Sequence, residues 1–383
     1  MGFSKNQYWI ILNILLISTG VFAQKEGNIW YFGNMAGLDF NSEAPVALTD
    51  GVMNTVEGSS AISDAMGNLL FYTDGVKVWN KVHEQMPNGF DLMGHSSSTQ
   101  SALIVQQPGS NNIYYIFTTP APYVNKDSAF RYSIVDITLQ GGLGDVTTKN
   151  VLLYHPTTEK LTAIRHSDGC GIWIISHKWE SDEFYVYLLD NSGVSATPVV
   201  SNIGHIHEGY STNTIGQLKA SPDGSKLALA IWLDQIVELF DFDNTTGVIS
   251  NPVSFPPEID RTYGLEFSPD GTKLYATSGG PNPFFGIWDI IQWDLMAGSP
   301  IDIIGSHTII AYTTAPAYAL QLGPDGKIYC SVLGNYLAAI NDPNALGIAC
   351  NYVDSDVYLG GKRTALGLPT FMSSHFYPQF EIT

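Results

Sequence analysis

The sequence predicts an all-β fold: a seven-bladed β-propeller of four-stranded blades, its ring closed by pairing N-terminal strands with a C-terminal strand. Three observations predict it. A strand–turn–strand pattern recurs along the chain, the two ends carry complementary strand fragments, and no amphipathic helix of about ten residues separates the strands. The 383 residues include 37 Gly, 20 Pro and only 14% charged residues, which is typical of many strands and tight turns.

The recurring pattern is clearest in three near copies. They read LKASPDGSKLALA from Leu218, LEFSPDGTKLYAT from Leu265 and LQLGPDGKIYCSV from Leu320. Pro presets φ at the turn, Asp tolerates the next position, and Gly takes the left-handed conformation that closes the hairpin. Looser copies start at Ala61, Leu103 and Ala163; in the second of these, Asn112 is expected to replace the turn glycine. The turns recur every 45–57 residues, which suits four short strands per unit.

Six such units occupy about residues 57–356, and the chain ends supply the seventh. Residues 28–50 read as second, third and fourth strands without a first, whereas 364–371 read as a first strand with nothing after it. Pairing them removes exposed strand edges. A β-sandwich would not explain six repeats in one frame.

Residues 1–23 have the pattern of a signal peptide, with Lys5 before a short apolar run and Ala23 before the cleavage point. The alternative is an N-terminal membrane anchor, but the apolar run is short for a span, and no later segment is long enough to cross a membrane. We therefore expect a propeller over 24–374, a tail over 375–383, and a secreted, cell-surface or periplasmic monomer.

The net charge is −19, and loss of Lys5 makes the mature chain more acidic. Such a surface repels phosphate backbones, which argues against nucleic acid as a partner. The three cysteines are Cys170, Cys330 and Cys350, without a CxxC pair. Their spacing leaves open whether Cys330 and Cys350 form a disulfide, and burial is the default for all three.

Ligands of propellers usually sit at the mouth of the central channel, where each innermost strand begins. The polar residues at these positions, expected to bind a ligand or to satisfy the loop backbone, are Glu57, Gln100, Lys160, Asn213, Arg261, Tyr263 and Arg363. Metal candidates are weaker. His205 and His207 would share one face of an extended strand and suit zinc, and the pairs Asp241/Asp243 and Asp354/Asp356 would suit calcium. Neither set has a complete ligand pattern, so we expect no cofactor and no metal.

Several stretches together resemble a known group of proteins. They are NIWYFGNMAGLDF from Asn28, ISDAMGNLLFYTDGVKVWN from Ile62, SSSTQSALIV from Ser96, YGLEFSPDGTKLY from Tyr263 and LGLPTF from Leu366. The chain resembles the N-terminal propeller region of bacterial gliding-motility-associated proteins, many of them cargo of the type IX secretion system, with WD-like or YVTN-like repeats. The resemblance implies a secreted or cell-surface protein and assigns no active site. Longer members continue into further β-domains and a sorting domain, whereas this chain stops at Thr383; it is therefore expected to be periplasmic or a fragment.

The leading hypothesis is an exported, non-catalytic binding, adhesion or scaffolding module with a protein or glycan ligand. The sequence holds no GxSxG elbow, HExxH helix or nucleotide-binding loop. The alternative is a propeller enzyme, a hydrolase, lactonase or lyase with a metal-assisted site in the channel. A third hypothesis is the remnant module of a larger surface protein.

Overall fold

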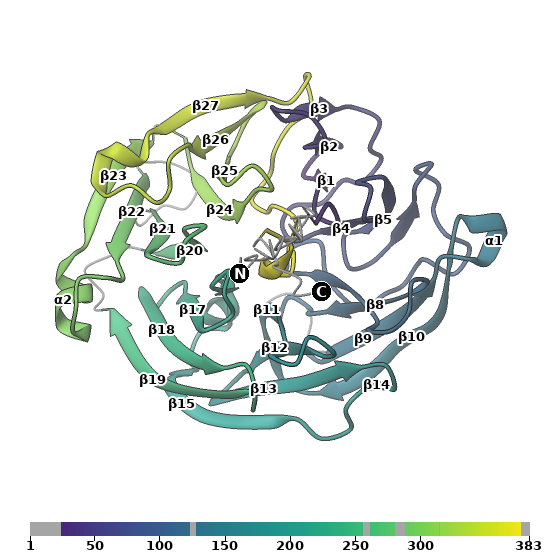
Figure 1. The fold of residues 1–383 in the computed structure, drawn as a ribbon, viewed down its shortest axis with the longest axis horizontal. Coiled ribbons are helices and arrows are strands. Elements are labelled where there is room, and N and C mark those ends of the chain that lie inside the picture. Colours follow the sequence, from purple (N-terminus) through teal and green to yellow (C-terminus); the bar gives the residue numbers. More distant parts are fainter. Residues whose placement is uncertain (1–23, 123–127, 256–260, 280–287, 314, 377–383) are drawn as a thin grey trace, which may run out of the picture.

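The computed structural model describes residues 24–122, 128–255, 261–279, 288–313 and 315–376. These residues form seven antiparallel sheets arranged as blades around a central axis, so the predicted seven-bladed β-propeller is confirmed (Figure 1). The signal-peptide prediction for 1–23 lies outside the described residues. No helix in the described ranges has the length and apolar character that a membrane span requires.

The blades are numbered from the N-terminus. Blade 1 contains β1 (Ile29–Phe32), β2 (Ala36–Asp39) and β3 (Val46–Leu48), and blade 2 contains β4 (Ser60–Ser63), β5 (Leu69–Thr73) and β6 (Val78–Asn80). Blade 3 contains β7 (Ala102–Gln106), β8 (Ile113–Thr118), β9 (Phe130–Asp136) and β10 (Asp145–Tyr154). Blade 4 contains β11 (Thr157–Arg165), β12 (Ile172–Lys178) and β13 (Ser181–Asp190), and both β14 (Gly193–Val194) and β15 (Val199–His207) pair with β13.

The last three blades each have four strands. Blade 5 contains β16 (Leu218–Ala220), β17 (Lys226–Ile231), β18 (Ile236–Asp243) and β19 (Val248–Phe255). Blade 6 contains β20 (Thr262–Phe267), β21 (Lys273–Gly279), β22 (Trp288–Asp294) and β23 (Thr308–Thr313). Blade 7 contains β24 (Ala317–Leu322), β25 (Ile328–Val332), β26 (Tyr336–Ile340) and β27 (Tyr352–Tyr358). The short helices are α1 (Leu139–Gly142), α2 (Pro300–Gly305), η1 (Ser211–Thr214), η2 (Gly347–Cys350) and η3 (Ser373–Phe376).

The C-terminal segment 364–371 closes the ring from the innermost position of blade 1, as predicted. The backbone N–H of Leu366 donates to Val56 O at 2.8 Å, and its carbonyl accepts from Ala319 N at 3.1 Å. The segment therefore joins blade 7 to blade 2. It pairs through isolated bridges because Gly367 passes so close to Glu57 that a Cβ there would lie 2.2 Å from Glu57 O, and because Pro369 lacks an N–H.

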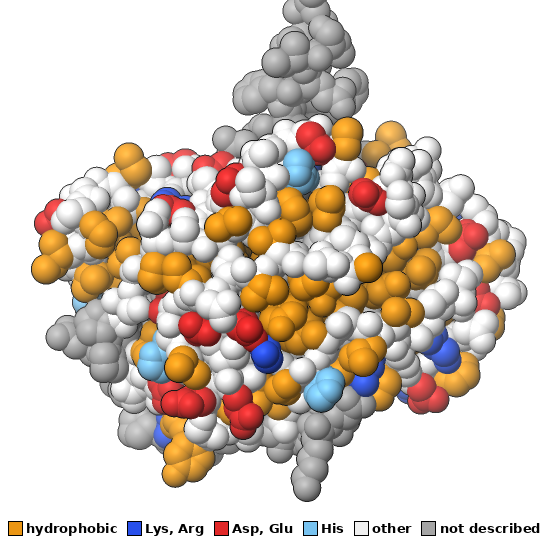
Figure 2. All heavy atoms as spheres, turned by 90° about the horizontal axis from the view of Figure 1, so that it is seen from below, with side chains coloured by type: hydrophobic (Ala, Val, Ile, Leu, Met, Phe, Trp, Pro, Cys, Tyr) orange, Lys and Arg blue, Asp and Glu red, His pale blue; other side chains and the backbone are white. Residues whose placement is uncertain are grey.

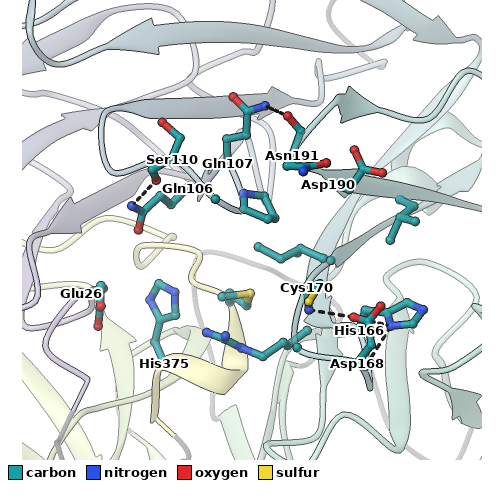
Figure 3. A pocket seen from close by; sticks show the side chains of 18 of the residues that line it. Glu26, Gln106, Gln107, Ser110, His166, Asp168, Cys170, Asp190, Asn191 and His375 are labelled. Carbon is teal, nitrogen blue, oxygen red and sulfur yellow. Dashed lines mark hydrogen bonds and ion pairs between the residues drawn. The ribbon is translucent and has the colours of Figure 1, made fainter.

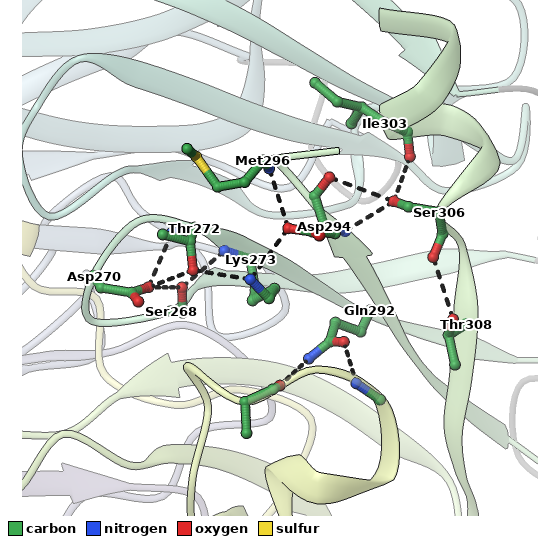
Figure 4. Close-up of polar contacts among 12 residues, drawn as sticks. Ser268, Asp270, Thr272, Lys273, Gln292, Asp294, Met296, Ile303, Ser306 and Thr308 are labelled. Atoms are coloured by element: carbon green, nitrogen blue, oxygen red, sulfur yellow. Dashed lines mark hydrogen bonds and ion pairs between the residues drawn. The ribbon is translucent and has the colours of Figure 1, made fainter. Parts of the chain in front are cut away.

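The repeated turn has the predicted chemistry in blade 6 (Figure 4). Asp270 Oδ1 accepts from Ser268 Oγ at 2.7 Å and from Thr272 N at 3.0 Å, while Gly271 adopts φ +70°. The expectation for blade 3 was wrong in one detail. Gly109, with φ +75°, takes the left-handed position, and Asn112 does not, because the Pro-Gly turn closes earlier in the chain.

Aromatic side chains pack between the blades. Trp30, Trp288 and Trp293 are almost completely buried, and the ring of Trp30 lies 5.7 Å from that of Phe371 in the closing segment. The outer strands face solvent and carry exposed apolar residues such as Val200 and Ile206; Figure 2 shows hydrophobic side chains gathered across one edge of the ring. Cys330 and Cys350 are buried free thiols, and Cys170 is an exposed one.

Candidate functional site

Five of the seven predicted channel residues are buried where the innermost strands begin. Glu57 and Gln100 precede β4 and β7, Lys160 lies in β11, Asn213 lies in η1 and Tyr263 lies in β20. None is more than 4% exposed. The two arginines are less buried than these five. Arg363 is exposed, and its backbone carbonyl accepts a hydrogen bond from Asn34 N. Arg261 is half-buried. The structure thus brings the buried five together as parts of the ring; whether any of the seven binds a ligand stays a prediction.

Glu57 and Tyr263 meet directly across the channel. The Tyr263 hydroxyl donates to Glu57 Oε2 at 2.8 Å, and Ser97 Oγ donates to Glu57 Oε1 at 2.9 Å. Burial raises the pKa of Glu57 to about 8, and the negative charge of Glu159 adds to the rise. Burial, then the neighbouring carboxylate, raises the pKa of Tyr263 well above its usual value, so Tyr263 remains a hydrogen-bond donor at neutral pH.

Glu159 and Lys160 form the second part of this channel network. Glu159 Oε2 accepts from the backbone N–H of Thr99 at 2.8 Å and from its hydroxyl at 2.7 Å. Lys160 Nζ donates to the carbonyls of Thr214 and Ile215 at 3.0 and 3.1 Å. Both side chains are buried because both faces of β11 are covered: the first eight residues of the strand, 157–164, are all buried.

The electrostatics of this pair follow from burial. Desolvation raises the pKa of Glu159 to about 7, although the hydrogen bonds from Thr99 oppose the rise. Desolvation lowers the pKa of Lys160 to about 7, opposed by the charge of Glu159. Perturbed titratable groups of this kind occur at functional sites, but structural ion pairs show them too.

Two glutamines link the edges of the innermost strands. Gln100 Oε1 accepts from Leu161 N at 3.1 Å and Leu218 N at 2.8 Å, and its Nε2 donates to Leu218 O at 3.1 Å. Gln217 Oε1 likewise accepts from Leu265 N at 3.0 Å and Leu320 N at 3.2 Å. Each amide satisfies inner-edge backbone groups that no neighbouring strand reaches.

Sequence reasoning missed several of these partners. Glu159 adjoins the predicted channel residue Lys160, and Thr99 immediately precedes Gln100. Gln217 lies near the predicted residue Asn213. A buried ion pair was also missed: Lys219 Nζ lies 2.9 Å from Glu266 Oε2 and 2.7 Å from Gln321 Oε1. The signal available was Lys or Glu inside otherwise apolar inner strands, where an unpaired charge would be costly.

The two histidines that were weak zinc candidates, His205 and His207, have different surroundings. The partly exposed His205 lies 3.4 Å from Asp234, whereas His207 is fully buried and stacked on His177 with ring centroids 3.7 Å apart. Asp241 pairs with Lys226 at 2.8 Å. No group of three or more metal-ligating side chains occurs in the parts of the chain that the structure describes. The expectation of no bound metal stays untested.

The Asp pairs have local partners. Asp243 accepts from Thr245 N at 2.9 Å and from Thr246 Oγ1 at 2.7 Å, which is the turn role expected for it. Asp354 accepts from the Tyr352 hydroxyl at 2.9 Å, and Asp356 lies 3.8 Å from Lys327.

A cavity of about 700 Å³ opens at the opposite face, where the first hairpin turns lie (Figure 3). It lies beside the ends of β4, β7 and β11 and is bordered by η3 and by the first described residues. Figure 3 shows Gln106, Gln107 and Ser110 on one side, with Glu26 and His375 across from them. The lining residues are Gln24, Glu26, Ile62, Gln106, Gln107, Pro108, Gly109, Ser110, Asn111, Arg165, His166, Asp168, Gly169, Cys170, Gly171, Ile172, Leu188, Asp190, Asn191, Met372 and His375.

Comparisons with solved structures support the fold. A Bacteroides uniformis protein provisionally named a 6-phosphogluconolactonase aligns with a TM-score of 0.52 and 12% identity over 87% of this chain and 98% of its own. A Lactobacillus plantarum protein aligns with a TM-score of 0.52 and 15% identity over 89% and 98%. At this identity the likeness shows the fold alone. No protein-family model matches the chain, and no curated protein matches it in sequence.

Proposed function

We propose that the chain is an exported, non-catalytic binding propeller whose ligand is a protein or a glycan. One observation carries the proposal. The channel groups with shifted pKa values, Glu57, Glu159 and Lys160, are buried and already engaged in hydrogen bonds within the protein, while the open polar cavity lies at the other face. The groups available to a ligand are therefore amides, carboxylates and a guanidinium typical of recognition.

The export part of the proposal is supported by the signal-peptide pattern of residues 1–23 and by the resemblance to surface-protein propellers. Expression of the full chain in a Gram-negative host, followed by N-terminal sequencing, should give a product that begins at Gln24. A membrane-bound product that retains Lys5 would contradict this part.

A second candidate function, a hydrolase, lactonase or lyase, is favoured by one observation. The two channel carboxylates have raised pKa values, which suits acid–base chemistry near neutral pH. Against it, Glu159 and Lys160 are fully buried, so a substrate would need the covering loops to move.

One experiment separates the two functions. Purified residues 24–383 are tested for turnover of 6-phosphogluconolactone and simple lactones, and for thermal stabilisation by peptides, glycans, calcium and zinc. Stabilisation without turnover is expected. Turnover that is lost in Glu57→Gln and Glu159→Gln, but kept in the exposed control Glu43→Gln, would overturn the binding proposal in favour of an enzyme.

A further inference from the structure

The cavity at the hairpin-turn face gathers polar atoms that have no hydrogen-bond partner among the described residues. The buried atoms concerned are Gln24 Oε1, Glu26 Oε2, Arg165 Nε and His375 Nδ1, and all four residues line this one cavity. A buried polar atom without a hydrogen bond costs about 1–3 kcal/mol, so such atoms are rare unless a further molecule serves them.

These atoms come from three separate parts of the chain. Gln24 and Glu26 precede β1, Arg165 ends β11, and His375 lies in η3. Ser373 Oγ donates to Ala220 O at 2.9 Å, which fixes η3 beneath blade 5. The polar atoms are thus held by the folded ring rather than by one loop, and they comprise two oxygen acceptors, one guanidinium donor and one imidazole nitrogen.

The charge of the cavity favours a cationic group. Its lining includes three carboxylates, Glu26, Asp168 and Asp190, against one guanidinium, that of Arg165, and the chain carries a net charge of −19. Asp168 is already occupied, because its Oδ1 lies 2.9 Å from His166 Nδ1 and accepts from Cys170 N at 2.7 Å. Asp190 Oδ1 accepts from Ser192 N at 2.7 Å. The carboxylate of Glu26 and the amide oxygen of Gln24 therefore remain for a ligand.

The apolar part of the lining indicates which polar ligand fits. Ile62, Ile172, Leu188 and Met372 line the cavity, whereas no Phe, Tyr or Trp is among its lining residues in the described chain. Sugars are commonly held by stacking on aromatic rings, whereas aliphatic side chains and the stem of a lysine or arginine pack well on aliphatic surface. The volume lies within the usual range for ligand sites, about 300–1,000 Å³.

We propose that this cavity binds a short peptide segment carrying a lysine or arginine side chain, its cation meeting Glu26 and Gln24 and a backbone carbonyl meeting Arg165 Nε. The proposal rests on the proposed binding function and names both its site and its ligand class. The ligand's peptide units supply the donors and acceptors that the unpartnered cavity atoms require.

Cys170 provides a direct measure of occupancy. It is exposed and lines the cavity, whereas the other two thiols are buried, so alkylation by iodoacetamide reports this position. The probes are pools of N-acetylated, C-amidated pentapeptides with Lys, Arg or Glu fixed at the centre, and maltopentaose and cellopentaose as sugars. Thermal unfolding is measured with the same probes.

We expect the Lys or Arg pool to slow Cys170 alkylation at least fivefold, which mass action gives once the ligand exceeds its Kd about fourfold. Glu26→Gln should reduce this protection below twofold. Gln24→Ala, which removes the other oxygen proposed to meet the cation, serves if Glu26→Gln does not fold. Glu43→Gln, an exposed carboxylate outside the cavity lining, should leave protection unchanged.

The proposal is overturned if no pool protects Cys170, if the Glu pool or a pentaose protects it equally, or if the folded cavity variants retain full protection. A probe that raises the melting temperature without protecting Cys170 would also overturn it. That last result would leave the proposed binding function intact, with the ligand bound elsewhere.

Discussion

Replacing Gln100 by Met tests whether the buried channel amides hold the ring together. Gln100 satisfies three backbone groups: it accepts from Leu161 N and Leu218 N and donates to Leu218 O. Methionine has a similar length and no comparable hydrogen-bonding capacity, so Gln100→Met leaves all three groups without a partner while keeping most of the packing.

The magnitude follows from these three groups. A buried backbone group that loses its partner costs about 1–3 kcal/mol, so the free energy of unfolding should fall by at least about 3 kcal/mol. Such a loss is a large share of the roughly 5–15 kcal/mol typical of folded proteins. The exposed Gln85 offers a matched control, since no hydrogen bond of its side chain occurs among the described contacts and Gln85→Met should change stability by less than about 0.5 kcal/mol.

Urea unfolding followed by tryptophan fluorescence measures the difference, with linear extrapolation to water. If Gln100→Met and Gln85→Met unfold within about 0.5 kcal/mol of each other, the amide does not link the strands. Gln100 would then be free to serve a ligand, as the sequence alone suggested.

Three further outcomes follow from the structure. Burial lowers the pKa of His177 to about 3, so the folded protein keeps it neutral while the unfolded chain protonates near pH 6.5; His177 alone should therefore lower stability by about 2 kcal/mol between pH 7.5 and 5, and the change between these pH values in urea unfolding should differ by this amount between His177→Gln and the unchanged protein. Gly271→Ala, at φ +70°, should lose about 1 kcal/mol in thermal unfolding, whereas Gly305→Ala, with no left-handed φ and open space around it, should be neutral or slightly stabilising. Tyr263→Phe removes a donor to a buried carboxylate and should cost about 1–3 kcal/mol by urea unfolding, against no change in the exposed control Tyr210→Phe.

The fold was predictable because its signals are local and repeated. The Asp and Gly of each turn act within five residues, so the contacts around Asp270 recur around Asp223 in blade 5. Closure of the ring was also predictable, because the N-terminal segment lacked the innermost strand of a blade and the C-terminal segment could supply it. The irregular pairing of 364–371 was less so, since it depends on how close Gly367 passes to Glu57, a distance that only the assembled ring defines.

The site was only partly predictable. Position at the start of an inner strand identified Glu57, Lys160 and Tyr263 as channel residues, since every blade presents that position to the axis. The burial of both faces of β11 could not be read from the sequence, and it places Glu159 in the same network as Lys160. The sequence showed that polar side chains lie near the propeller axis. It did not show whether each of them contacts solvent or forms hydrogen bonds with the backbone at a strand edge.

This distinction decides where a ligand can bind. Innermost strands of a propeller leave one edge facing the axis, and its N–H and C=O groups need partners. At the strand starts, buried side chains provide those partners: Gln100, Gln217 and Lys160 form hydrogen bonds with backbone groups of neighbouring blades. The polar side chains at this end of the channel therefore stabilise the ring and are not available to a ligand. At the strand ends, polar side chains such as Arg165 have buried atoms without a hydrogen-bond partner in the described part of the chain. Recognition should therefore move to the hairpin-turn face, where a ligand supplies the missing hydrogen bonds instead of displacing existing ones.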